Sequence, residues 1–169
     1  MIGAIAAGER EAVETDIGER EQALDFRTFQ THVAPNTHSD LVFKGALDGS
    51  SRSIYTGLIR IEPNASGVEA YQTNRNIKLS EHAWAESVPN LEIENNDVKC
   101  SHASAVGPID DEQKFYLESR GVPTEVAERL VVQGFFADIV ATLPHAGLAE
   151  AVEAELTSRL QAQMAEATS

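Results

Sequence analysis

The chain contains a single cysteine among its 169 residues, which limits the redox chemistry that it can support. One cysteine cannot form an internal disulfide bond, so a reducing, cytoplasmic setting is the simplest expectation. The sequence also lacks an apolar run long enough to cross a bilayer and a basic-then-apolar leader. Neither insertion into a membrane nor secretion is therefore expected.

Positive charge is scarce as well. The chain has 13 lysines and arginines against 27 aspartates and glutamates, which gives a formal net charge of -14. A surface of this sign repels nucleic acid phosphates and anionic lipids, so neither is an expected partner. The hydrophobic content of 42% is nevertheless sufficient for a core, and it predicts one compact unit, or one unit with a helical appendage.

Common catalytic signatures are also missing. The sequence has no Gly-rich phosphate loop, no Gly-x-Ser-x-Gly elbow and no Cys-x-x-Cys pair. Two acidic pairs, Glu92 with Glu94 and Asp110 with Asp111, are better explained as a solvated strand face and a helix start. The chain is therefore not expected to be an enzyme.

The first part of the chain, residues 1–107, has the pattern of β-structure. Runs that cluster or alternate β-branched and apolar residues are separated by turn-rich stretches, and they predict strands over 41–47, 53–62, 76–81 and 90–95. Most of the turns are irregular and longer than two residues, so a coiled stack of strands and a sandwich fit about equally well. Residues 1–24 form either an incoming strand pair or a truncated end.

Residues 108–169 have the pattern of a helical domain. The first helix is expected to begin at a cap, Asp110 or Asp111, and to stop at Gly121. A second helix begins at Pro123-Thr124 and ends before Pro144, and a third follows directly. The apolar stripe expected on the second helix consists of Val126, Leu130, Phe135 and Ile139.

The stretch "VKCSH", residues 98–102, is the candidate site. In an extended strand Cys100 and His102 project to the same face, where an imidazole beside a thiol favours its ionised form and the two groups can bind one metal. An iron-sulfur cluster generally needs four protein ligands, so this chain cannot hold one alone. The alternative is that Cys100 is simply a small buried hydrophobic residue.

Two further histidines, His32 and His38, are six residues apart, a spacing that matches no standard metal-ligand pattern. They are better explained as turn and surface residues. A mononuclear metal hydrolase is a third hypothesis, and it requires His32, His38 and His102 to converge in space.

Four stretches carry a family resemblance: "HVAPNTHSDLVFKGALDG", "AYQTNRNIKLSEHA", "PNLEIENNDVKCSHASAVG" and "DDEQKFYLESRG". From about Asp25 to Phe136 the chain resembles the carboxy-terminal part of the SufB/SufD family of iron-sulfur cluster assembly proteins, and the SufD side more closely. The resemblance implies a right-handed parallel β-helix followed by a small α-helical domain.

The resemblance also implies partners and a cofactor. A SufD-like scaffold pairs with a SufB-like subunit through the β-helices, and its helical domain docks a SufC-like ABC-type ATPase. The complex assembles a transient iron-sulfur cluster at the partner interface, to which His102 and Cys100 would contribute, and no cluster is held stably by this chain alone. The residues expected to bind the ATPase are Phe115, Leu130, Phe135 and Ile139.

The chain departs from the family pattern in two ways. Ala103 stands where members usually have glycine after the histidine, and the amino-terminal turns of the β-helix are missing. A β-helix cut across its turns has an open edge, which leaves a homodimer as a possible assembly. The competing functional hypothesis is a metal-independent β-helix module for structure or interaction, with Cys100 inert.

Overall fold

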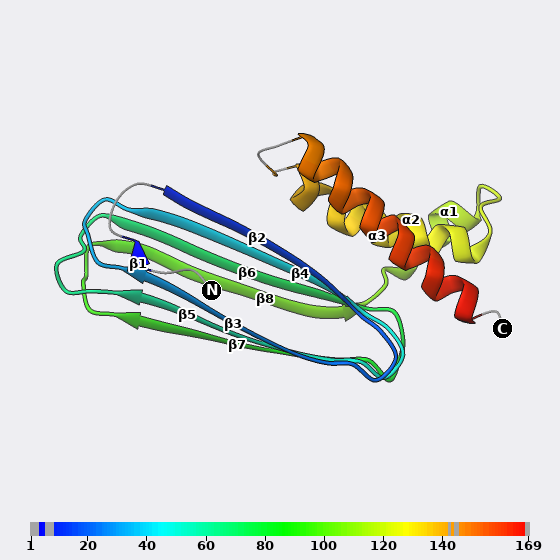
Figure 1. The fold of residues 1–169 in the computed structure, drawn as a ribbon, viewed down its shortest axis with the longest axis horizontal. Helices are drawn as coiled ribbons and strands as arrows, with labels where there is room; N and C mark the ends of the chain where they lie inside the picture. Colours follow the sequence, from blue (N-terminus) through cyan, green and yellow to red (C-terminus); the bar gives the residue numbers. More distant parts are fainter. Residues whose placement is uncertain (1–3, 6–8, 142, 144–145, 168–169) are drawn as a thin grey trace.

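The computed structural model describes residues 4–5, 9–141, 143 and 146–167. Over these residues the chain forms a long stack of strands followed by helices (Figure 1). The strands are β1 (Ala4–Ile5), β2 (Glu9–Gly18), β3 (Ala23–His32), β4 (His38–Leu47), β5 (Arg52–Ile61), β6 (Val68–Lys78), β7 (Trp84–Ile93) and β8 (Val98–Pro108). The helices are α1 (Asp111–Glu118), α2 (Thr124–Ala141) and α3 (Ala146–Ala167).

The strands coil into a parallel β-solenoid with two strands in each turn. One sheet has the order β1-β3-β5-β7 and the other β2-β4-β6-β8, and every neighbouring pair is parallel. The chain therefore returns to the same sheet once per turn, so that Ala23, Arg52 and Trp84 lie side by side. This topology confirms the expected parallel β-helix and excludes the antiparallel sandwich.

Alternation along each strand builds the interior of the solenoid. Along β6 the even-numbered residues from Val68 to Asn76 are buried, whereas the residues between them are half-buried or exposed. Apolar side chains fill much of the interior in two clusters, one around Ile59, Ile61 and Val68 and one around Phe43 and Tyr55. In successive turns, interior residues of one strand thus lie beside interior residues of the next, as expected for a parallel in-register ladder.

The strands are longer than the sequence pattern indicates. The expected strand over 76–81 shares only residues 76–78 with β6 and extends past its end. The earlier part of β6 was missed because its interior positions include the polar Gln72 and Asn74. Buried polar side chains hide the apolar alternation that marks a strand. β3 and β2 also confirm that the chain before residue 33 contributes strands to the stack.

The helix boundaries follow local capping chemistry. The Asp110 carboxylate accepts hydrogen bonds from the backbone N–H groups of Glu112 and Gln113 at 2.9 and 3.3 Å, which caps α1. Gly121 has φ of +85°, a left-handed conformation that ends the first helical segment. Thr124 begins α2 directly after Pro123, as the sequence predicts.

The helices cover part of the outer face of one sheet, beside β2 and β4 (Figure 1). Ile17, Ala46 and Ile77 point outward from β2, β4 and β6 and form one buried cluster with residues of α2 and α3. The helical members of this cluster are Val132, Phe136, Ile139, Leu156 and Leu160. None of the described helices has the length and apolar character needed to span a membrane.

The apolar stripe expected on α2 is only partly the buried one. Ile139 is buried, whereas Leu130 is 42% exposed and the adjacent Val131 and Val132 are buried instead. α2 contacts α1, α3 and the solenoid at once, so its buried face is wider than a single stripe and is rotated away from Leu130.

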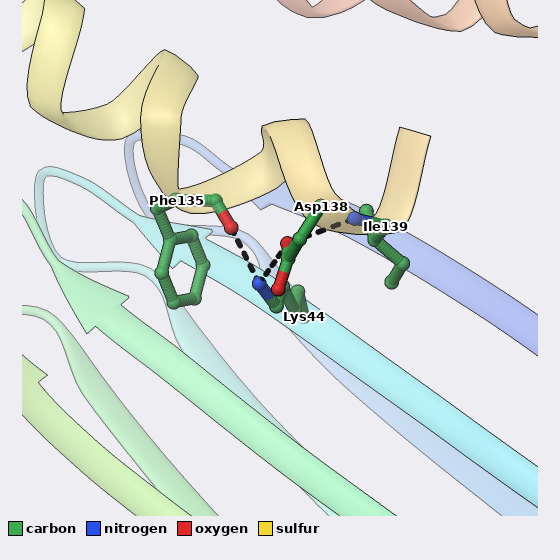
Figure 2. Close-up of polar contacts among 4 residues, drawn as sticks. All are labelled: Lys44, Phe135, Asp138 and Ile139. Carbon is green, nitrogen blue, oxygen red and sulfur yellow. Dashed lines mark hydrogen bonds and ion pairs between the residues drawn. The ribbon is translucent and has the colours of Figure 1, made fainter. Parts of the chain in front are cut away.

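A lysine fastens α2 to the solenoid, as Figure 2 shows. Lys44 lies on the outer side of β4, and only 5% of its side chain is exposed. Its Nζ donates a hydrogen bond to the Phe135 carbonyl at 2.6 Å, forms an ion pair with the Asp138 carboxylate, and lies 4.8 Å from the centre of the Phe135 ring. These three contacts join segments that are about 90 residues apart in the sequence.

Asp138 is held in its charged form by this arrangement. Partial burial acts to raise the pKa of its carboxyl, but the hydrogen bond and charge of Lys44, together with the Ile139 N–H at 2.8 Å, outweigh it. The pKa of Asp138 therefore lies below its ordinary value, and the ion pair is present at neutral pH.

Candidate functional site

The last turn of the solenoid, formed by β7 and β8, is open on one side. Each of these strands is the final one in its sheet, and no other described strand pairs with its outer edge. Leu91, Ile93 and Val106 occupy interior positions of this turn but are 37%, 42% and 42% exposed, whereas Ile59 and Ile61 in the previous turn are fully buried. We call this surface the open end, and it combines unpaired backbone with apolar side chains.

Cys100 lies at the inner part of the open end. It pairs in register with Ala70 and packs, half-buried, against the apolar cluster that contains Ile61 and Val68. Burial raises the pKa of the Cys100 thiol, so the neutral thiol predominates at neutral pH. The expectation that a neighbouring imidazole would favour the thiolate is wrong for this conformation, because burial is the cause that dominates.

His102 lies two residues further along β8, on the same face of the strand as Cys100. It pairs in register with the buried Gln72, and its own side chain is exposed because no turn covers it. Lys99 projects to the opposite face, where its Nζ contacts the Glu69 carboxylate at 2.6 Å. The open end therefore presents an accessible imidazole next to a less accessible thiol.

The histidines in the described part of the chain do not converge on a metal site. His32 is buried inside the solenoid, where its ring nitrogens contact the hydroxyl oxygens of Thr37 at 2.6 Å and Ser39 at 2.8 Å. His38 lies outside, with its ring centre 5.9 Å from that of Tyr71. No three His, Cys, Asp or Glu side chains in the described part of the chain come together to hold a metal ion, which removes the basis of the mononuclear hydrolase hypothesis.

The residues expected to dock an ATPase fall into two groups. Phe115, on α1, and Leu130, on α2, are 69% and 42% exposed. Leu130 lines a groove of about 760 Å³ between the two helices, whereas Phe115 is not one of its lining residues. The groove is lined by apolar residues that include Leu117 and Val131, with the carboxylates of Asp110 and Glu112 among its lining residues. We call this surface the helical groove.

The other two residues face the solenoid. Ile139 is 3% exposed in the cluster that joins the helices to the strands, and Phe135 packs against the same cluster next to Lys44. Their side chains hold the helical domain in place, which leaves Phe115 and Leu130 as the members of the expected set that a partner can reach.

Gln72 and Gly57 are parts of the site that the sequence pattern does not reveal. Gln72 is buried directly behind His102, and its amide lies against Gly57 of the facing sheet. A Cβ atom on Gly57 would lie 1.8 Å from the Gln72 Nε2, so only glycine leaves room for this amide. A glycine inside a strand is a general sign of such a close approach, and it is the one signal available from the sequence.

Comparisons with known proteins identify a family. Residues 7–135 match the family model of the SUF system FeS cluster assembly SufBD core domain. The chain is 39% identical to the iron-sulfur cluster assembly protein SufD of Bacillus subtilis over 132 residues and 34% identical to that of Escherichia coli over 141 residues. These alignments cover 78% and 83% of the chain and 30% and 33% of the two relatives.

An iron-sulfur cluster assembly SufBD family protein of Mycobacterium tuberculosis is 38% identical over 164 residues, which cover 92% of the chain and 41% of that relative. The chain thus spans less than half the length of these curated relatives. Since the family model matches well over half of the chain, including β2 to β8, the chain belongs to the SufB/SufD family of iron-sulfur cluster assembly proteins.

Proposed function

We propose that the chain acts as a SufD-like scaffold subunit of a SUF-type assembly complex. In this proposal the open end pairs with a SufB-like subunit, and an iron-sulfur cluster is assembled transiently between the two. The observation that carries the proposal is the exposed His102 on the uncovered last turn, flanked by apolar interior residues and unpaired strand edges.

The ligand arithmetic supports a shared site. The chain offers one imidazole and one thiol at the open end, and an iron-sulfur cluster generally takes four protein ligands. His102 is the more accessible of the two, whereas Cys100 is half-buried and largely protonated. His102 is therefore the primary ligand that this chain contributes in our proposal, and the partner supplies the remaining ligands.

The helical groove is the proposed docking site for a SufC-like ATPase. The groove joins apolar walls, which include Leu130, to the carboxylates of Asp110 and Glu112. Phe115, on α1 outside the groove lining, is the most exposed large apolar residue described in the chain and extends the apolar surface of this domain. A partner that fits this surface inserts an apolar side chain and places basic groups near these carboxylates. ATP hydrolysis then belongs to that partner, and the present chain acts as a scaffold.

A metal-independent interaction module is the second candidate. The observation in its favour is the packing of Cys100 against an apolar cluster, which is how an inert buried thiol is placed. In that case the open end pairs with another chain, including a second copy of this one, without any cluster.

The interface is tested by measuring the affinity of the chain for a SufB-like partner. Val106→Lys places a charge on the open end, and we expect at least a tenfold weaker affinity because the charge is desolvated on pairing. Val33→Lys is the matched control, since Val33 is 41% exposed against 42% for Val106 and lies outside the open end. Equal affinities for both variants would contradict the proposed interface.

The docking site is tested separately with a SufC-like ATPase. Phe115→Asp and Leu130→Asp should each weaken binding, because they place charge where an apolar contact is proposed. Ile54→Asp on the outer face of β5 is the control, since Ile54 is 37% exposed against 42% for Leu130. Binding that is insensitive to both variants, with helical content unchanged, would remove the exposed surface of α1 and α2 as the docking site, and insensitivity to Leu130→Asp alone would remove the helical groove.

A further inference from the structure

Gln72 lies in the interior of the solenoid one turn behind His102. It is 2% exposed, and it pairs in register with His102 of β8 on one side and Leu41 of β4 on the other. Neither its Oε1 nor its Nε2 has a hydrogen-bond partner among the described residues. A buried primary amide without any partner is costly, so its presence calls for an explanation.

The neighbours of Gln72 offer its amide little to bond with. Leu41 is apolar, Ala70 precedes it on the same face of β6, and Gly57 faces it from the other sheet without a side chain. Asn74, the next interior residue of β6, is engaged with Ser87 and Asn76 at 3.3 and 2.6 Å. The remaining direction is toward the last turn, where the adjacent interior position of β8 is His102.

The reach of the two side chains fits a direct contact. Neighbouring strands are about 4.8 Å apart, and in a parallel in-register pair the two side chains extend in the same direction. The exposed ring of His102 has room to turn toward the interior by rotation about its side-chain bonds. A rotation of this kind is what a hydrogen bond between a ring nitrogen of His102 and the Gln72 amide requires.

We propose that Gln72 is the positioning residue for His102: its Oε1 accepts a hydrogen bond from one ring N–H, which leaves the lone pair of the other ring nitrogen directed toward the open end. Histidines that bind metals commonly donate their second ring N–H in this way, which fixes both the tautomer and the orientation of the ring. The inference rests on the proposed role of His102 as a ligand and adds the residue that prepares it.

The test is the tautomer and the mobility of the His102 ring, followed by ¹⁵N and ¹³C NMR of the full chain. The wild type should show one ring N–H tautomer and an ordered ring. Gln72→Met keeps the size of the side chain and removes both polar atoms, and it should give averaged ring ¹⁵N shifts and a mobile ring. Gln72→Glu provides a carboxylate acceptor and should restore the single tautomer.

The matched control is Gln30→Met, because Gln30 is also a fully buried interior glutamine but lies in an earlier turn and donates to Ser39 at 2.9 Å. It should leave the His102 ring signals unchanged. Identical ring signals in the wild type and Gln72→Met would overturn the proposal, even if a cluster assembles at His102. If His102 proved not to bind a cluster, these NMR results would still stand. The positioning role of Gln72 and the ligand role of His102 can therefore be disproved separately.

Discussion

His32 illustrates how individual polar residues are accommodated inside the solenoid. Both of its ring nitrogens contact hydroxyl groups, and burial, followed by the charge of His38, lowers its pKa below the ordinary value of 6.5. The neutral ring is thus preferred in the folded chain. The unfolded chain takes up this proton first as the pH falls, so the contribution of His32 to stability is complete above about pH 6.5 and is lost below it.

We therefore expect the free energy of unfolding to fall between pH 7.5 and pH 5.5. Urea denaturation at a series of pH values measures this change. His32→Gln should be less stable at pH 7.5 but should show a flatter pH dependence, whereas His82→Gln, an exposed control, should retain the wild-type slope. An unchanged slope in His32→Gln would show that His32 is not the group responsible.

Lys44 is the residue that most directly ties the helices to the strands. Lys44→Met removes the hydrogen bond to Phe135 and the ion pair with Asp138, and we expect a loss of about 1–2 kcal/mol, since hydrogen bonds from a charged group are worth about 1.5–3 kcal/mol. The expected loss of stability is at the lower end of this range because the Asp138 side chain is 68% exposed and solvent screens its charge. Denaturant unfolding measures the loss.

Hydrogen exchange locates the effect of the same substitution. Amide protons of α2 should exchange faster in Lys44→Met, while those of β5 should not change. Lys99→Met is the control, because the exposed pair of Lys99 with Glu69 should contribute nothing measurable. Equal protection of α2 in the wild type and Lys44→Met would contradict the fastening role of Lys44.

Some of these residues are invisible to sequence reasoning for a physical reason. The pairing of His102 with Gln72 depends on the register between β6 and β8. These strands are neighbours in the sheet but are separated in the sequence by β7. The sequence around Lys44 gives no sign that α2 buries its side chain. By contrast, Asp110 was predictable as a cap because its partners lie within three residues.

Among the strands, β5 and β6 are matched to one another across the interior. Gly57 in β5 makes room for the Gln72 amide in β6, and the two are mutually dependent. Gly57→Ala should destabilise the chain by about 1–3 kcal/mol, because the amide must move within a packed interior. In Gly57→Ala with Gln72→Ala the added methyl group meets no amide, so the combined loss should be smaller than the sum of the single losses.

The measurement is a double-mutant cycle by denaturant unfolding. Gly45→Ala combined with Gln72→Ala is a suitable control, since a Cβ on Gly45 would meet Asn76 at 2.4 Å and not Gln72. Its losses should be closer to additive. Strict additivity in the cycle of Gly57 with Gln72 would contradict the placement of the amide.

The helices were easier to predict than the strands. Helix ends are set by local capping, and their positions agreed with the sequence pattern at Asp110, Gly121 and Thr124. Strand extents depend on the neighbouring turns, and the polar interior of β6 concealed most of that strand. The buried face of α2 was predicted only in part. It is determined by contacts with α1, α3 and β4, and β4 is distant from α2 in the sequence.

The molecule as a whole has two candidate surfaces on different elements. The open end belongs to β7 and β8, and the helical groove lies between α1 and α2, on a domain that Lys44 and the apolar cluster hold against the outer side of the other strands. The resemblance to the SufB/SufD family predicted the order of these parts. The full ligand set could not be predicted, because the remaining ligands in our proposal lie on another chain.

In our proposal, His102 contributes a ligand to a cluster at the open end. The most direct measurement is anaerobic reconstitution with iron and sulfide of the complex formed with SufB-like and SufC-like partners, read by visible absorption. We predict that His102→Ala assembles the same complex but loses most of the cluster signal, and that Cys100→Ala loses less. A full cluster signal in His102→Ala, with the complex intact, would contradict the account and favour a metal-independent module.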